Sequence, residues 1–288
     1  MSLKSDIEAH FNTQDLGPTR KDPIQRIIEL STHLAVSFYP HAPREAQITV
    51  GIFNTYVTAI DDIADELRPD LHNFAFTKAP TSKLLASFTN WLEGKSTRTA
   101  FGQFGNDMIR KSVLDFITIC YYKLDQEDNI ASSYCPAQAP QFAEYIRTKS
   151  SLAEAYALFA FPEHIYPEGV CLSRYLPVVP DLMRFICAVN DVLSFPEERK
   201  GEKFTFVHIY SRVKGVEPLQ ALGDICEETV RLMHRIRGVL GEERMRGDIE
   251  AFMHGYILLH LGTPRYKLYE MDIPAAKEAA RRLGVVLS

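Results

Sequence analysis

Hydrophobic residues recur every three to four positions along most of the chain, the spacing that places them on one face of an α-helix. Prolines, which interrupt helices because they lack a backbone donor, fall between or at the ends of these periodic segments, as at Pro40, Pro69 and Pro264. Few segments alternate with the period of a β-strand. We therefore expect one all-α domain over residues 1–288, with its core at about 23–270. Helices are predicted at 23–39, 44–66, 80–93, 103–126, 138–161, 178–195, 203–213, 216–239, 243–262 and 275–286.

The composition is that of an ordinary globular protein, with 46% hydrophobic and 24% charged residues. A formal net charge of −5 argues against nucleic-acid binding, which usually leaves a basic surface. The first residues lack the apolar core of a signal peptide, and no apolar run is long enough to cross a membrane, so we expect a cytoplasmic protein without membrane insertion. The cysteines lack CxxC spacing, which favours reduced thiols over zinc or disulfides. They are Cys120, Cys135, Cys171, Cys187 and Cys226.

An acidic cluster, Asp61, Asp62 and Asp65, follows the apolar segment that begins at Phe53. On a continuous helix, Asp61 and Asp65 would share a face, with Asp62 about 100° away. Mg²⁺ prefers such oxygen ligands, and a bound cation would offset the repulsion among three neighbouring carboxylates. A solvated acidic helix end is the alternative. The apolar segment that precedes the three aspartates favours a helix that lines a buried space over one that faces water.

A second polar stripe contains Asn190, Ser194 and Glu198, spaced so that they follow one side of a helix. An amide oxygen, a hydroxyl and a carboxylate form a mixed oxygen site that would hold Mg²⁺ weakly until an anion completed it. In isolation, a plain polar helix stripe is the favoured explanation of this pattern. Each of the two patterns is expected by chance about 0.05 times in a chain of this composition, so their joint occurrence is far more informative than either.

The ordered pair of motifs resembles the metal signature of class I terpene cyclases, in particular the trichodiene-synthase-like fungal sesquiterpene synthases. The resemblance extends to the segment FMHGYILLHLGTPRYKLYE near the C-terminus. It implies that Arg147, 43 residues before Asn190, binds a diphosphate together with Arg265 and Tyr266. It also implies an all-helical fold around a central cavity.

The activity implied by this resemblance is Mg²⁺-dependent ionisation of farnesyl diphosphate and cyclisation of the resulting cation to a sesquiterpene, with three Mg²⁺ ions. The metal ligands would be Asp61, with Asp65, and Asn190, Ser194 and Glu198. A homodimer is compatible with the resemblance. Aromatic faces stabilise cations. The expected wall residues are Phe53, Tyr56, Phe116, Phe185 and Tyr256, in preference to the distant Trp91.

Three positions depart from the family pattern. Glu197 replaces a lysine, which makes Lys200 a candidate substitute. Pro196 interrupts the second motif and predicts that Glu198 lies at a helix end. Leu259 replaces a large aromatic residue, which predicts a different product. Two alternatives stay open: chain elongation of a prenyl diphosphate, although such enzymes carry a second aspartate-rich motif, and a non-catalytic helical scaffold.

Overall fold

The computed structural model describes residues 2–17, 21–75, 80–132, 139, 141–198, 205–264, 266–271 and 274–282. These residues form helices joined by turns and loops, and no strand occurs among them, so the predicted all-α class is confirmed. The helices are α1 (Leu3–Asn12), α2 (Lys21–Phe38), α3 (Arg44–Asp62), α4 (Ala64–His72), α5 (Lys83–Glu93), α6 (Ser96–Ser132), α7 (Phe142–Ser150), α8 (Ala153–Leu158), α9 (Glu168–Tyr175), α10 (Val179–Glu198), α11 (Phe206–Lys214), α12 (Pro218–Val239), α13 (Glu243–Gly262) and α14 (Pro274–Arg282), with short 3₁₀ turns at Leu176–Val178 and Leu268–Met271.

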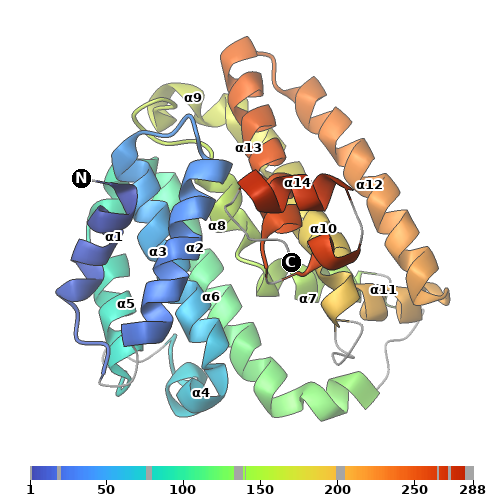
Figure 1. Ribbon diagram of the computed structural model, residues 1–288, viewed down its shortest axis with the longest axis horizontal. Helices are drawn as coiled ribbons and strands as arrows, with labels where there is room; N and C mark the ends of the chain where they lie inside the picture. Colours follow the sequence, from blue (N-terminus) through green and yellow to red (C-terminus); the bar gives the residue numbers. More distant parts are fainter. Residues whose placement is uncertain are drawn as a thin grey trace.

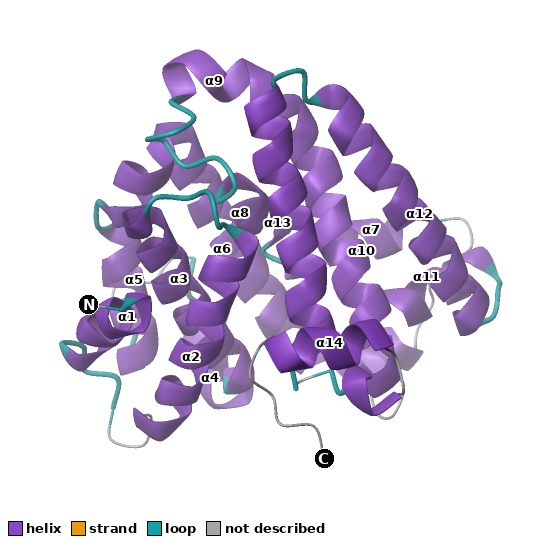
Figure 2. Ribbon diagram, turned by 45° about the horizontal axis from the view of Figure 1, so that its top comes forward, coloured by secondary structure: helices purple, strands orange, loops and turns teal. Residues whose placement is uncertain are grey.

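The long helices surround a shared interior (Figure 1). Helix α2 packs between α3 and α13, and α10 packs against α8, α12 and α13. Helices α1 and α5 cover the side of the molecule formed by α3, while α11 and α12 form the opposite side (Figure 1). Helix α14 lies across the end of α13 (Figure 2). Elements from both halves of the sequence therefore face one another across the interior.

Two of the predicted helices are interrupted. The expected helix over 44–66 ends at Asp62 because Ile63 leaves helical geometry (φ −128°, ψ 22°), and α4 then begins at Ala64. The change of direction lets Leu67 and Leu71 become buried where α4 packs against α6. The expected helix over 138–161 is divided into α7 and α8 at Leu152, which has a left-handed backbone (φ 54°, ψ 14°). A left-handed leucine costs of order 1 kcal/mol, so the surrounding packing must hold this break in place.

Other boundaries also differ from the prediction. The core begins earlier than residue 23, because Leu3, Ile7 and Phe11 of α1 are buried in the main cluster. Helix α9 was not predicted, and α6 is longer than expected, with a kink at Gly102 (φ 73°, ψ −174°). Pro69 lies inside α4 and not in a gap.

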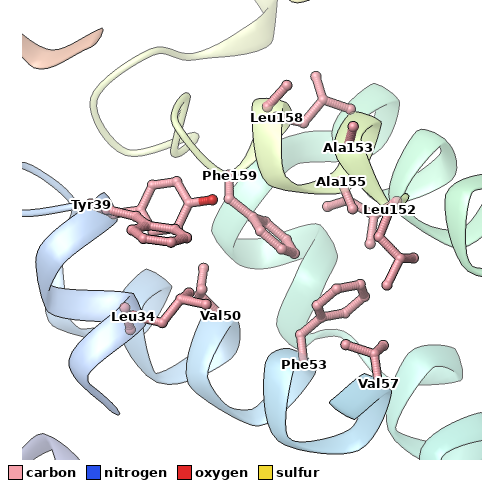
Figure 3. Close-up of a cluster of buried hydrophobic side chains, with 14 of the residues drawn as sticks. Leu34, Tyr39, Val50, Phe53, Val57, Leu152, Ala153, Ala155, Leu158 and Phe159 are labelled. Carbon is pink, nitrogen blue, oxygen red and sulfur yellow. The ribbon is translucent and has the colours of Figure 1, made fainter. Parts of the chain in front are cut away.

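The core between α2, α3 and α8 is rich in aromatic side chains (Figure 3). Phe53 and Phe159 meet edge to face with ring centroids 5.0 Å apart, and Tyr39 lies beside Phe159. Phe53 also contacts Phe88 and Trp91 of α5. Such pairs add roughly 0.5–1.5 kcal/mol each beyond their burial, so this cluster fixes α3 firmly against its neighbours.

Helices α2 and α13 approach so closely at Gly255 that a Cβ atom there would overlap the backbone carbonyl of Ser37. We expect Gly255→Ala to lower the free energy of unfolding by roughly 1–3 kcal/mol, because backbone cannot yield as a flexible side chain can. Gly247→Ala in the same helix is the matched control, since nothing lies within 4 Å of the added carbon. It should raise the free energy of unfolding by roughly 0.5–1 kcal/mol in urea denaturation. Equal effects of the two substitutions would contradict the close approach.

Candidate active site

A cavity of about 460 Å³ opens between α2, α3, α6, α8, α10 and α13. One part of its wall is apolar and another carries charged and amide groups. The lining residues are Leu30, Leu34, Phe38, Asn54, Val57, Thr58, Asp61, Phe116, Lys123, Arg147, Ser150, Ser151, Leu152, Tyr156, Ile186, Asn190, Tyr256, Leu259, His260, Thr263 and Tyr266. The cavity therefore brings together residues from both sequence motifs.

The acidic motif reaches the cavity through Asp61, at the exposed C-terminal end of α3. Asp62 and Asp65 line an adjoining smaller cavity of about 240 Å³, which shares Asp61 with the main one. Asp65 lies in the first turn of a different helix, α4, its side chain is 82% exposed, and its carboxylate lies 3.7 Å from Arg68. The prediction that Asp61 and Asp65 share one face of a continuous helix is therefore wrong, because the helix breaks at Ile63 between them.

A hydrogen-bonded group on α7, α10 and the chain after α13 faces the cavity. The Arg147 guanidinium donates through Nη2 to Oδ1 of Asn190, 2.8 Å away, and its Nε lies 2.8 Å from Oδ1 of Asp191. The Asn190 amide in turn donates to the Tyr266 hydroxyl at 3.2 Å. The Tyr266 ring stacks on His260, with centroids 5.1 Å apart. Arg147, Asn190 and Tyr266 are thus held together by hydrogen bonds through the Asn190 amide.

The Arg147–Asp191 pair is almost fully buried, with side-chain exposures of 16% and 7%. Burial disfavours the charged guanidinium, but the neighbouring Asp191 carboxylate outweighs this and raises the pKa of Arg147 further above its ordinary value. Burial raises the pKa of Asp191, and the Arg147 charge offsets part of that shift. Oδ2 of Asp191 accepts no hydrogen bond from the described part of the chain. Arg147 is therefore a permanent cation whose orientation depends on Asp191.

Among the predicted metal ligands, the Asp61 carboxylate and the Asn190 amide oxygen, which also accepts from Arg147, lie on the cavity wall, while the Ser194 hydroxyl lies one turn further along α10 and off that wall. All are oxygen donors of the kind that Mg²⁺ prefers. Within the described residues, no three His, Cys, Asp or Glu side chains converge as a metal site. This donor set fits an ion completed by an anionic ligand better than an ion held by protein alone.

The structure places the other predicted metal ligands less directly. Ser194 is buried and is not among the lining residues of the cavity. Helix α10 continues through Pro196 and ends at Glu198, as expected for a residue at a helix end. The Glu197 and Glu198 side chains, Arg265 and Lys200 lie outside the described residues.

Of the five aromatic residues predicted to line the cavity, two do so and three do not. Phe116 and Tyr256 line the cavity. Phe53, Tyr56 and Phe185 do not; they are fully buried in the core, so the prediction that they form the cavity wall is corrected. The Tyr56 hydroxyl instead bonds Ser87, 2.6 Å away, at the side of the molecule covered by α1 and α5.

For Phe53 and Tyr56, the physical reason for this error is the direction in which each side chain leaves α3. Counting 100° per residue, Asn54 and Val57 lie within about 40° of the direction of Asp61, whereas Phe53 lies about 80° and Tyr56 about 140° away. Asn54 and Val57 accordingly line the cavity. The helical count from Asp61 would have identified the correct face from the sequence.

A buried polar network in the cavity wall was also missed. The Tyr156 hydroxyl donates to Oδ1 of Asn54, and Nδ2 of Asn54 donates to Oγ of Ser31, 2.9 Å away. The Thr55 hydroxyl also bonds Ser31, and the Tyr39 hydroxyl donates to the Tyr156 carbonyl at 2.8 Å. Burial raises the pKa of Tyr156, which keeps its hydroxyl protonated. The network presents neutral polar groups, fixed in orientation, to an otherwise apolar wall.

The cysteines of the described chain, Cys120, Cys171, Cys187 and Cys226, are free thiols. Among the helices that the structure describes, none combines the length and the apolar character that crossing a bilayer requires.

Known proteins resemble this chain over nearly its whole length. A family model described as trichodiene synthase (TRI5) matches residues 12–283. An (E)-beta farnesene synthase of Metarhizium brunneum is 30% identical, over 98% of this chain and 86% of that protein. Monoterpene synthase 25 of Postia placenta is 29% identical, over 92% of this chain and 80% of that protein.

A solved structure has the same fold. The linalool/nerolidol synthase of Streptomyces clavuligerus, in complex with 2-fluorogeranyl diphosphate, superposes with a TM-score of 0.59 at 17% identity, covering 92% of this chain and 96% of that one. Fold, cavity and family match agree: the chain belongs to the trichodiene synthase (TRI5) family and is a class I terpene cyclase, a lyase that acts on a prenyl diphosphate.

Proposed function

We propose that this chain is a sesquiterpene synthase that ionises farnesyl diphosphate and guides the resulting cation to a terpene with release of diphosphate. One observation carries the proposal: Asp61 and the Arg147–Asn190–Tyr266 group line the same cavity as a wall of apolar and aromatic side chains. A prenyl diphosphate has the matching division into a charged head and a hydrocarbon tail. The cavity volume of about 460 Å³ falls within the range of roughly 300–1,000 Å³ that small-molecule sites occupy.

The diphosphate head would lie at the Arg147 end of the cavity. Arginine offers a planar set of donors that matches phosphate oxygens, and the Tyr266 hydroxyl adds a neutral donor beside it. Mg²⁺ bound by Asp61, Asn190, Ser194 and Glu198, with Asp65 as a further candidate, would supply charge that stabilises the leaving group. The fixed Arg147–Asp191 pair needs little reorganisation when negative charge develops on the leaving oxygen, which is the condition for effective electrostatic stabilisation.

The hydrocarbon tail would lie against Leu30, Leu34, Phe38, Phe116, Val57, Ile186 and Leu259. These side chains offer no nucleophile, and they exclude water that would otherwise quench a cation. The faces of Phe38 and Phe116 can stabilise positive charge by about 0.5–2 kcal/mol each. The shape of this wall would then select the fold of the tail and so the product.

The relatives support a prenyl diphosphate substrate but differ in the products that their names state, a farnesene in one case and monoterpenes in another. The fifteen-carbon substrate is therefore part of the proposal and needs its own test. Chain elongation is a weaker candidate, because the second motif contains Asn190 and Ser194 where a second aspartate-rich motif would be needed.

Incubation of the purified chain and Mg²⁺ with C10, C15 and C20 prenyl diphosphates, each with and without isopentenyl diphosphate, tests the proposal. We expect a hydrocarbon or terpene alcohol, detected by mass spectrometry of volatiles, with the highest kcat/KM for the C15 substrate. Omission of the divalent ion should abolish turnover. A longer diphosphate as the product would contradict the proposal in favour of elongation, and equal or better use of the C10 substrate would contradict the assigned chain length.

A further inference from the structure

Lys123 of α6 lines the main cavity and both smaller cavities that adjoin it. Its side chain is half-buried, and the structure gives it no hydrogen bond or ion pair with any described residue. Other lysines nearby are paired: Nζ of Lys149 lies 2.7 Å from Asp115, and Nζ of Lys111, also on α6, lies 3.4 Å from Glu154. Lys123 is thus a cation at a cavity wall with no ion-pair partner among the described residues.

The charges around Lys123 come from both sides of the site. Asp61, Asp62 and Asp65 line the smaller cavity that Lys123 shares with α3 and α4. Asp191 and Arg147 line the cavity that it shares with α7 and α10. The Lys123 charge acts on the buried Asp191, where it opposes the rise in the pKa of that carboxyl caused by burial. Lys123 therefore lies between the two motifs, and it forms no ion pair with a described residue of either.

Arg147 is already partly engaged, because its Nε faces Asp191 and its Nη2 donates to Asn190. A diphosphate carries several negative charges on two phosphoryl groups, more than one such guanidinium neutralises. In the part of the chain that the structure describes, Lys123 and Arg147 are the lysine and arginine side chains on the main cavity wall. A lysine suits this place because its ammonium is a compact charge on a flexible stem.

We propose that Lys123 binds the diphosphate of the substrate, as a second cation beside Arg147. The inference rests on the proposed function, since it names a residue that would contact the head group of a prenyl diphosphate. A purely structural role is the rival: Lys123 would only offset repulsion among the carboxylates of the acidic motif. The two roles differ in what the substitution Lys123→Gln does to ligand binding.

Isothermal titration calorimetry with inorganic pyrophosphate in the presence of Mg²⁺ measures this directly. We expect Lys123→Gln to weaken pyrophosphate binding by about 10- to 100-fold, the range for loss of one charge-assisted hydrogen bond. Lys123→Arg, which keeps the charge, should recover most of the affinity. Lys111→Gln is the matched control, because it removes a lysine of the same helix whose partner is Glu154, and it should bind as the wild type does.

A titration with Mg²⁺ alone shows whether weaker pyrophosphate binding in the variant could come from weaker Mg²⁺ binding. Loss of the Lys123 charge should strengthen Mg²⁺ binding at the acidic motif, because a neighbouring cation repels the ion, while pyrophosphate binding becomes weaker. The melting temperature of the ligand-free variant, measured alongside, should stay close to that of the wild type.

Failure of the inference and failure of the proposed function give different results. If the wild type binds no pyrophosphate with Mg²⁺, the proposed function itself is contradicted. If the wild type binds it and Lys123→Gln binds it equally well, the role of Lys123 is overturned while the function stands. Equal weakening in Lys123→Gln and Lys111→Gln also overturns that role.

Discussion

Replacement of Arg147 by alanine should lower the free energy of unfolding by about 3–5 kcal/mol, because the substitution leaves the Asp191 carboxylate buried without its cation. Oδ2 of Asp191 already accepts no hydrogen bond from a described residue, so loss of the guanidinium would leave this carboxylate without its close ion pair. Urea denaturation followed by circular dichroism measures the change. Arg235→Ala is the control, since Arg235 pairs with Asp181 at 2.8 Å but is 54% exposed. We expect a loss of at most about 1 kcal/mol there.

The double variant Arg147→Ala/Asp191→Ala identifies the cause of that loss. If the uncompensated carboxylate is responsible, removal of both partners should be less destabilising than the Arg147 substitution alone. A double variant as unstable as the sum of the two single variants would contradict a specific pairing and point to lost packing of the arginine stem.

Replacement of Asp61 by alanine should lower kcat roughly 10²- to 10³-fold, the loss usual for removal of one group that stabilises the developing charge. The free energy of unfolding should change by no more than about 0.5 kcal/mol, because the side chain is exposed at a helix end. Steady-state kinetics with the preferred prenyl diphosphate and a parallel denaturation curve measure both quantities.

Asp107→Ala is the control for Asp61, because Asp107 is an exposed carboxylate of α6 that lies off the cavity wall and accepts a hydrogen bond from Gln103. It should leave turnover unchanged. An Asp61→Ala enzyme with near-normal kcat would show that α3 only borders the cavity and that its carboxylate has no part in ionisation.

Helical periodicity was sufficient to predict the all-α fold, because it reports which face of each segment is buried. Periodicity alone could not predict the breaks at Ile63 and Leu152, since neither residue type signals the end of a helix, although the helix-weakening pair Ser150 and Ser151 precedes the second break. Their backbone conformations are set by packing with distant helices, such as that of Leu67 and Leu71 where α4 meets α6. Helices α1 and α9 are short, at 10 and 8 residues, and so carry weak periodic signals.

The sequence predicted the polar residues of the cavity better than its aromatic wall residues. Asp61, Arg147, Asn190 and Tyr266 were all expected at one site, and the structure brings them to one cavity. Nothing in the local sequence around Lys123 marks it, because its position depends on how α6 packs against α3 and α7.

The polar network around Asn54 and Tyr156 has a consequence for how the cavity can diverge among relatives. A substitution of Tyr156 leaves the Asn54 carbonyl oxygen without its donor, and Asn54 also bonds Ser31 of α2, so the change would need compensating changes at Ser31 or Asn54. The aliphatic side chains of Leu34, Val57 and Leu259, which also line the cavity, take part in no hydrogen bonds. New products should therefore arise first through exchange of these aliphatic residues, while the tyrosine stays fixed.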